Sequence, residues 1–107
     1  MFTLAIFNLL MYQYDGAGLN ESEEYNLNYC LSFYEQDNLY ALAARVREAK
    51  TIGEIVAISG KDVETFQKEF NVSYEDYYAW EDNRMTPYEK YMLAYLITHE
   101  AYCRPRV

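Results

Sequence analysis

Apolar residues recur at helical spacing along most of the chain, and short runs of turn-forming or capping residues separate these segments. Residues 3–14 carry apolar side chains on nearly every side, which is typical of a helix buried by the rest of its domain. Phe, Ile and Tyr are also common in strands, so a strand stays open as the alternative for this segment. Asp15, Gly16 and Gly18 end the segment because they favour a turn.

A second helix is predicted to begin at Asn20, which forms a capping box with Glu23, and to run to about Gln36. A capping box pairs two backbone N–H groups that the first turn of a helix otherwise leaves unpaired. Aromatic rings at a spacing of four residues give this helix an apolar band. The residues of that band are Tyr25, Leu27, Tyr29, Cys30, Leu31, Phe33 and Tyr34.

A third helix is predicted from Asn38 to about Lys50, with Asp37 as its N-cap. Its inner face is expected to comprise Leu39, Leu42, Ala43 and Val46. Arg45, Arg47 and Lys50 form a basic cluster at the end of this helix. Because cations near a helix C-terminus complement the helix dipole, we expect this cluster to stabilise the helix and not to bind a ligand.

Thr51 and Glu54 form another capping box, which opens a short apolar segment that Gly60 closes. The segment is predicted to be a short helix, but the β-branched residues within 52–58 also allow a strand, so the strand stays open as the alternative. Asp62 is the predicted cap of the following helix.

A tight turn between two short helices is predicted next. Phe66 and Phe70 lie four residues apart, which places both rings on one face of the first helix. Asn71 stands at the turn, where its tolerance of the left-handed conformation is useful. Ser73, followed by Asp76, is the predicted cap of the second helix. The residues expected to face the core from that helix are Tyr77 and Trp80.

Thr86 and Pro87 begin the last predicted helix as its cap and first-turn proline, and this helix runs to about Tyr102. Four tyrosines form one stripe along it, beside a second apolar band. One band must face the core, and the other is a candidate dimer or partner face. The tyrosines are Tyr88, Tyr91, Tyr95 and Tyr102, and the second band is Met92, Leu93, Leu96 and Ile97.

Together these elements predict an all-α fold, a small single-domain bundle of six to seven helices that contains a helix-turn-helix. Residues 1–50 supply the N-terminal helices, and residues 51–102 supply the helix-turn-helix and the C-terminal helix. A chain of 107 residues with 51% hydrophobic residues is long and apolar enough for one core without disulfides.

The order of residues in the predicted helix-turn-helix resembles the phage-repressor (XRE-type) helix-turn-helix family, over about residues 51–97. The matching positions are Phe66, Phe70, Asn71, Val72, Ser73, Trp80, Glu81, Asn83 and Arg84, ahead of a helix that begins with proline. The resemblance implies a dimeric regulator that places the helix from Tyr74 to Asp82 in the major groove of DNA. Asn71 replaces the family's turn glycine, and Gln67 replaces its small alanine. The positions that match the family's base-reading residues are Tyr74, Glu75, Tyr78 and Ala79.

Charge changes the function expected of this motif. The chain has 17 acidic and 9 basic residues, a net charge of −8, and neither residues 1–44 nor residues 69–83 contain Lys or Arg. Affinity for DNA depends on neutralising phosphates with Lys and Arg, so such a surface repels a polyanion and favours a basic surface on another protein. The simpler alternative is a solvated face. Likewise, the 13 tyrosines either pack at the solvent-exposed margin of a small hydrophobic core or supply a binding face.

The sequence contains no arrangement typical of an enzyme or a metal site. His99 is the single histidine, and its neighbour Glu100 points in another direction on a helix. Cys30 and Cys103 are too few for a metal site or a disulfide framework, and they predict reduced thiols in a cytoplasmic protein. The first apolar segment lacks a basic flank and the length of a membrane span. We therefore expect no catalytic or metal-binding residue, no cofactor, no enzyme activity and no membrane contact.

These observations predict a non-enzymatic phage or mobile-element protein that acts by binding a protein with a basic surface. One version is an acidic mimic of nucleic acid that inhibits a host nucleic-acid-binding machine, as anti-CRISPR and anti-restriction proteins do. The alternative is the family's function, a sequence-specific DNA-binding regulator, repressor or antitoxin-like, that binds DNA as a homodimer. The candidate partner-binding residues are Tyr74, Glu75, Asp76, Tyr78, Glu81 and Asp82.

Overall fold

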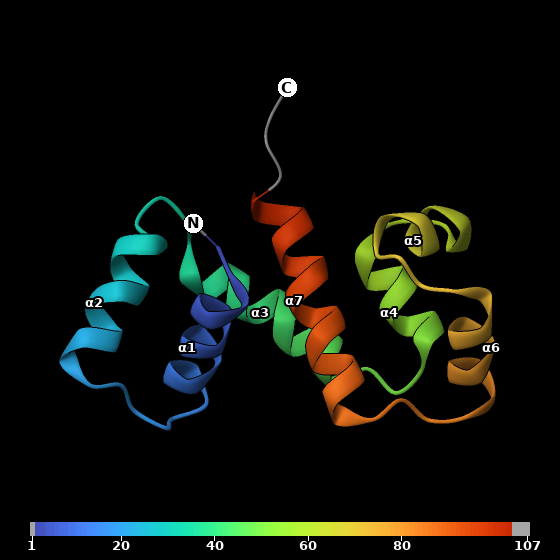
Figure 1. The fold of residues 1–107 in the computed structure, drawn as a ribbon, viewed down its shortest axis with the longest axis horizontal. Coiled ribbons are helices and arrows are strands. Elements are labelled where there is room, and N and C mark those ends of the chain that lie inside the picture. The colour runs from blue at the N-terminus through green and yellow to red at the C-terminus, as the bar shows by residue number, and fades with distance from the viewer. Residues whose placement is uncertain (1, 104–107) are drawn as a thin grey trace.

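The computed structural model describes residues 2–103, and within them every regular element is an α-helix (Figure 1). The predicted all-α class is therefore confirmed, and the number of helices lies within the predicted range. The helices are α1 (Leu4–Tyr14), α2 (Glu21–Cys30), α3 (Gln36–Glu48), α4 (Ile52–Ser59), α5 (Val63–Glu69), α6 (Tyr74–Asp82) and α7 (Pro87–Cys103).

The helices form a flat body of 43 × 35 × 18 Å in which α3 and α7 pack together at the centre. Helices α1 and α2 lie at one end of the long axis, and α4, α5 and α6 lie at the other end (Figure 1). Buried residues of both ends and of the centre belong to one hydrophobic core. Because α3 also contacts α1 and α4, the central pair joins the two ends.

Side-chain caps explain where most of the helices begin. In each case a side-chain oxygen accepts a hydrogen bond from the backbone N–H three residues later, which satisfies a donor that the first turn leaves unpaired. The predicted caps of α2, α4, α5, α6 and α7 are confirmed. The capping residues, including that of α1, are Thr3, Asn20, Thr51, Asp62, Ser73 and Thr86.

Both segments for which the sequence left helix and strand open are helical. Residues 3–14 form α1 together with its N-cap Thr3, and residues 52–58 lie within α4. Their apolar side chains are divided between core and surface. Buried residues of α1 are Ile6, Phe7, Leu10 and Met11, and those of α4 are Ile52, Ile55 and Val56.

The boundary between the second and third helices was predicted wrongly. Helix α2 ends at Cys30 and not near Gln36, and α3 begins at Gln36 without a side-chain cap. Asp37 is not the cap of α3, because it lies in the first turn, where it accepts a hydrogen bond from the Tyr14 hydroxyl. The aromatic spacing continues past the end of α2, but Phe33 is 97% exposed, so this ring contributes nothing to the core.

Candidate functional site

Helices α5 and α6 are joined by a short, well-packed turn. Asn71 has φ 55° in the left-handed region, as predicted, and the Val72 N–H donates to the Gln67 carbonyl at 2.9 Å. The rings of Phe66 and Phe70 lie 5.0 Å apart, and both are buried. Left-handed backbone suits Asn better than most other residues. The turn therefore holds α6 at a fixed position against the end of the body.

A carboxylate from α7 holds the inner side of α6. Tyr77 is buried, as predicted, and the Trp80 indole Nε1 donates to Glu89 Oε2 at 2.8 Å. Glu89 Oε1 accepts from the Thr86 N–H at 2.8 Å, while the Thr86 hydroxyl accepts from the Glu89 N–H at 3.1 Å. The Thr86 backbone N–H, followed by the Trp80 N–H, lowers the pKa of Glu89 below its ordinary value. Glu89 thus combines a capping box with a link between α6 and α7.

All of the predicted partner-binding residues lie on α6 and are exposed, although Asp76 lies on the side of Trp80 and lines a pocket with it and Glu89. Tyr74 and Tyr78 stack on each other with ring centroids 6.2 Å apart, although 68% and 60% of their surfaces remain exposed. The same helix carries four carboxylates, and none of them forms an ion pair within residues 2–103. These carboxylates belong to Glu75, Asp76, Glu81 and Asp82.

The four carboxylates do not share one physical explanation. Glu75 and Asp76 lie in the first turn of α6, where an acidic residue stabilises the helix dipole. Glu81 and Asp82 lie in the last turn of α6, which itself contains no basic residue, and the dipole opposes them by roughly 0.3–1 kcal/mol each. The dipole of α6 therefore gives no reason for the acids at its C-terminal end.

Cations near α6 gather at its C-terminal end. An open cleft of about 420 Å³ lies there, lined in part by Glu81 and Asp82 and by the cations Lys50, Arg84 and Lys90. Lys90 donates to the Ala49 carbonyl at 3.3 Å. These cations lie beside the two acids at the C-terminal end of α6 and moderate their negative charge.

The tyrosine stripe of α7 does not form one exposed face. Tyr88 and Tyr102 are 71% and 40% exposed. Tyr91 and Tyr95 are half-buried, and their rings lie 5.1 and 5.5 Å from the ring of Phe7 on α1. The middle of the stripe therefore joins α7 to α1, and its two ends are left at the surface.

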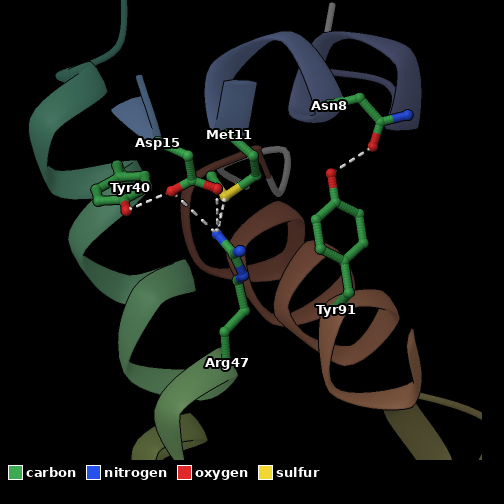
Figure 2. A network of polar contacts seen from close by, with 6 residues as sticks. All are labelled: Asn8, Met11, Asp15, Tyr40, Arg47 and Tyr91. Carbon is green, nitrogen blue, oxygen red and sulfur yellow. Dashed lines mark hydrogen bonds and ion pairs between the residues drawn. The ribbon is translucent and has the colours of Figure 1, made fainter. Parts of the chain in front are cut away.

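Arg47 does more than complement the dipole of α3, because it joins three helices (Figure 2). Its guanidinium lies 3.1 Å from a carboxylate oxygen of Asp15 and 3.4 Å from the sulfur of Met11. The same group lies 5.6 Å from the centre of the Tyr91 ring. Asp15 also accepts from the Tyr40 hydroxyl at 2.7 Å, and this bond raises the pKa of Tyr40. The partners are far apart in sequence, so no local pattern indicated this network.

Two aromatic residues of α2 lie where the sequence did not predict them. Leu27 and Leu31 are buried as expected, but Tyr25 and Tyr29 from the same predicted band are 68% and 72% exposed. Tyrosine is compatible with core and surface alike, so the spacing alone did not distinguish the two. The acidic residues of the first turn of α2 were the available signal, because acidic side chains mark the part of a helix that faces solvent.

The remaining candidate chemistry is sparse within the described part of the chain. His99 is exposed, with its ring 5.9 Å from the ring of Phe2. Among residues 2–103, no group of three or more His, Cys, Asp or Glu side chains is placed to hold a metal ion. The side chain of Cys103 lies outside the described residues. The arrangement on α6 is suited to binding through aromatic area and negative charge.

Comparisons with protein-family models, with curated proteins and with solved structures gave no match. No helix within residues 2–103 combines the length and the apolar character needed to cross a lipid bilayer.

Proposed function

We propose that this protein binds a partner protein with a basic surface, and that it does so through the outer face of α6. In this proposal the carboxylates of α6 occupy sites that nucleic-acid phosphates otherwise fill on the partner. The protein is then a non-enzymatic inhibitor of a nucleic-acid-binding machine, of the kind that anti-CRISPR and anti-restriction proteins represent.

The observation that carries the proposal is the exposed, stacked pair Tyr74–Tyr78, on a helix whose four carboxylates have no ion-pair partner in residues 2–103. Tyrosine supplies binding area at a low cost in side-chain entropy, and it is enriched where interfaces concentrate their energy. The carboxylates attract a basic surface and accelerate association with it. The acids at the C-terminal end of α6 oppose its dipole, so the dipole does not account for them.

A second candidate is the DNA-binding regulator that the family resemblance implies. It is favoured by the α5–α6 pair with its left-handed Asn71, because a helix held this way can be presented to a groove. The exposed carboxylates of α6 oppose the phosphate field of DNA, and this opposition makes the protein-binding proposal the stronger one.

The test begins with capture of host proteins on the immobilised wild-type protein, followed by challenge with duplex DNA and RNA. A nucleic-acid mimic predicts that the captured protein is released by nucleic acid, because both ligands occupy the same basic surface. The double variant Glu75→Lys, Asp76→Lys should lose the partner while keeping the wild-type circular dichroism spectrum. Equal binding of the partner by this variant, or failure of nucleic acid to compete, overturns the mimic proposal.

A matched control has the same change in net charge at another place. The double variant Glu48→Lys, Glu64→Lys alters two exposed carboxylates outside α6 and should keep the partner. Loss of the partner from both double variants would mean that net charge alone drives binding. A gel-shift assay with DNA from upstream of the protein's own coding sequence tests the second candidate. A shift that weakens steeply with salt supports the regulator.

A further inference from the structure

From the outward side of α2 we infer a second docking surface, which binds an arginine-rich segment of a partner protein. The α2 surface shares with the proposed function only the chemical class of the partner, whereas the bivalent arrangement also rests on the proposed α6 face. The protein then binds basic protein segments at both ends of its long axis, through one face on α2 and one on α6.

The two faces share an unusual feature. Tyr25 and Tyr29 stack with ring centroids 6.1 Å apart and an interplanar angle of 15°, and Tyr74 and Tyr78 stack at 6.2 Å and 23°. Each of the four rings is at least 60% exposed. Leu27, on the other side of α2, is fully buried, so the core does not need the tyrosines of this helix. Tyrosine is also a poorer helix former than Ala, Leu or Glu, so helix formation does not explain the pair.

Negative charge accompanies the α2 pair. Glu21 lies four residues before Tyr25 and so continues the same stripe, and Glu24 lies beside it. Neither carboxylate forms an ion pair within residues 2–103, and residues 1–44 contain no Lys or Arg. The nearest local account is the helix dipole, which explains the acids of the first turn and leaves the exposed rings unexplained. Aromatic faces next to unpaired carboxylates are complementary to a cation.

The occupant that fits both groups is arginine. Its planar guanidinium stacks on an aromatic ring while its N–H groups bond a carboxylate, and it is more weakly hydrated than the lysine ammonium. The protein itself contains this arrangement, because Arg47 lies over the Tyr91 ring at 5.6 Å and bonds Asp15 at 3.1 Å. The α2 face offers the rings and the carboxylates of such a site to a guanidinium from another chain.

The positions of the two faces make the protein bivalent. Helices α2 and α6 lie at opposite ends of the long axis (Figure 1), and that axis measures 43 Å. A short peptide cannot span both faces. They therefore engage two separate basic segments, either of one large partner or of two copies, and simultaneous contact strengthens binding by raising the effective concentration at the second face.

The test uses a short, capped oligo-arginine peptide, titrated calorimetrically into the full chain at low salt, with oligo-lysine of equal length for comparison. We expect two peptides per protein, one at each face, and tighter binding of oligo-arginine by several-fold. The double variants Tyr25→Ala, Tyr29→Ala and Tyr74→Ala, Tyr78→Ala should each bind one peptide. Alanine favours helix, and circular dichroism confirms that α2 and α6 persist.

A control variant, Tyr12→Ala, Tyr88→Ala, removes two exposed tyrosines that do not belong to these pairs, and it should still bind two peptides. Two peptides on the Tyr25→Ala, Tyr29→Ala variant overturn the inference, as does equal affinity for the two peptides. If the wild type binds one peptide and the Tyr74→Ala, Tyr78→Ala variant binds none, the α2 surface is overturned and the proposed function stands. One peptide lost only with Tyr25 and Tyr29 supports the α2 surface and removes the α6 face.

Discussion

Replacing Glu89 by alanine tests whether one carboxylate fixes α6 to α7. The change removes the acceptor of the Trp80 N–H and of the Thr86 N–H, both at 2.8 Å. It also leaves the partly buried indole N–H without its partner. We therefore expect the Glu89→Ala variant to be less stable than the wild type, with its loosening concentrated between α6 and α7.

The magnitude follows from the two hydrogen bonds. A hydrogen bond to a charged group contributes about 1.5–3 kcal/mol to stability. Glu89 is only half-buried, so the low end applies and solvent replaces part of each bond. The expected loss is about 2–3 kcal/mol in the free energy of unfolding. At about 4 °C per kcal/mol for a domain of this size, Tm falls by roughly 8–12 °C.

Urea unfolding followed by tryptophan fluorescence measures this change, since Trp80 is the single tryptophan. The control Glu81→Ala removes an exposed carboxylate that opposes the α6 dipole, and its stability should stay within about 0.5 kcal/mol of the wild type or rise slightly. Glu89→Gln keeps one acceptor oxygen without the charge and should lie between the alanine variant and the wild type. A loss below about 0.5 kcal/mol in Glu89→Ala would refute the link.

The pH dependence gives an independent check on Glu89. Its pKa is lowered in the folded state, first by the Thr86 N–H and then by the Trp80 N–H, so the folded protein binds this proton more weakly than the unfolded chain does. The stability that the carboxylate provides is present above its ordinary pKa and disappears as the pH falls through the lowered value. The difference in stability between wild type and Glu89→Gln should therefore shrink on acidification, and a constant difference would contradict this account.

Three further changes have defined outcomes in unfolding experiments. Thr98→Val should raise the free energy of unfolding by about 1 kcal/mol in urea, because the Thr98 hydroxyl is fully buried without a hydrogen-bond partner among the described residues. Asn71→Ala should cost about 1 kcal/mol in the same assay while Asn71→Gly costs only a few tenths, because φ is 55°. Burial and the bond to Asp37 raise the pKa of Tyr14 from 10.0 to about 12. The free energy of unfolding should therefore fall as the pH rises from about 10 to about 12, and it should fall less in the Tyr14→Phe variant, which has no hydroxyl at this position.

Much of the fold could be predicted because helix starts are encoded locally. A side chain at the cap bonds a backbone group three residues away, so Asn20, Thr51, Asp62 and Ser73 act within one turn. The conformation of Asn71 was also predictable from local sequence, because Asn tolerates the left-handed region that a helix end often needs. Glu89 belongs to the same class of signal, since Thr86 precedes it at the spacing of a capping box, but its bond to the indole depends on how α6 and α7 pack.

The rest depends on contacts between distant segments. The end of α2 is set by where the chain turns to bring α3 against α1, and the aromatic spacing runs on past that point. Tyr25 and Tyr91 belong to equally regular stripes, yet one ring is exposed and the other packs on Phe7. Tyrosine has an apolar body and a polar tip, so a periodic pattern cannot assign it to core or surface. The four candidate acids of α6 could be predicted to be exposed because charge is unambiguous, whereas Tyr74 and Tyr78 were singled out by the family resemblance.

The central position of α7 has a consequence for synthesis on the ribosome. Helix α3 packs mainly against α7, although residues 49–86 separate the two in the chain. A nascent chain that has emerged only as far as residue 86 therefore holds α1 to α6 without the helix that packs against α3 at the centre. Its apolar surface is a substrate for chaperones until α7 emerges. The central pair of helices is thus completed last, after the helices at both ends have been synthesised.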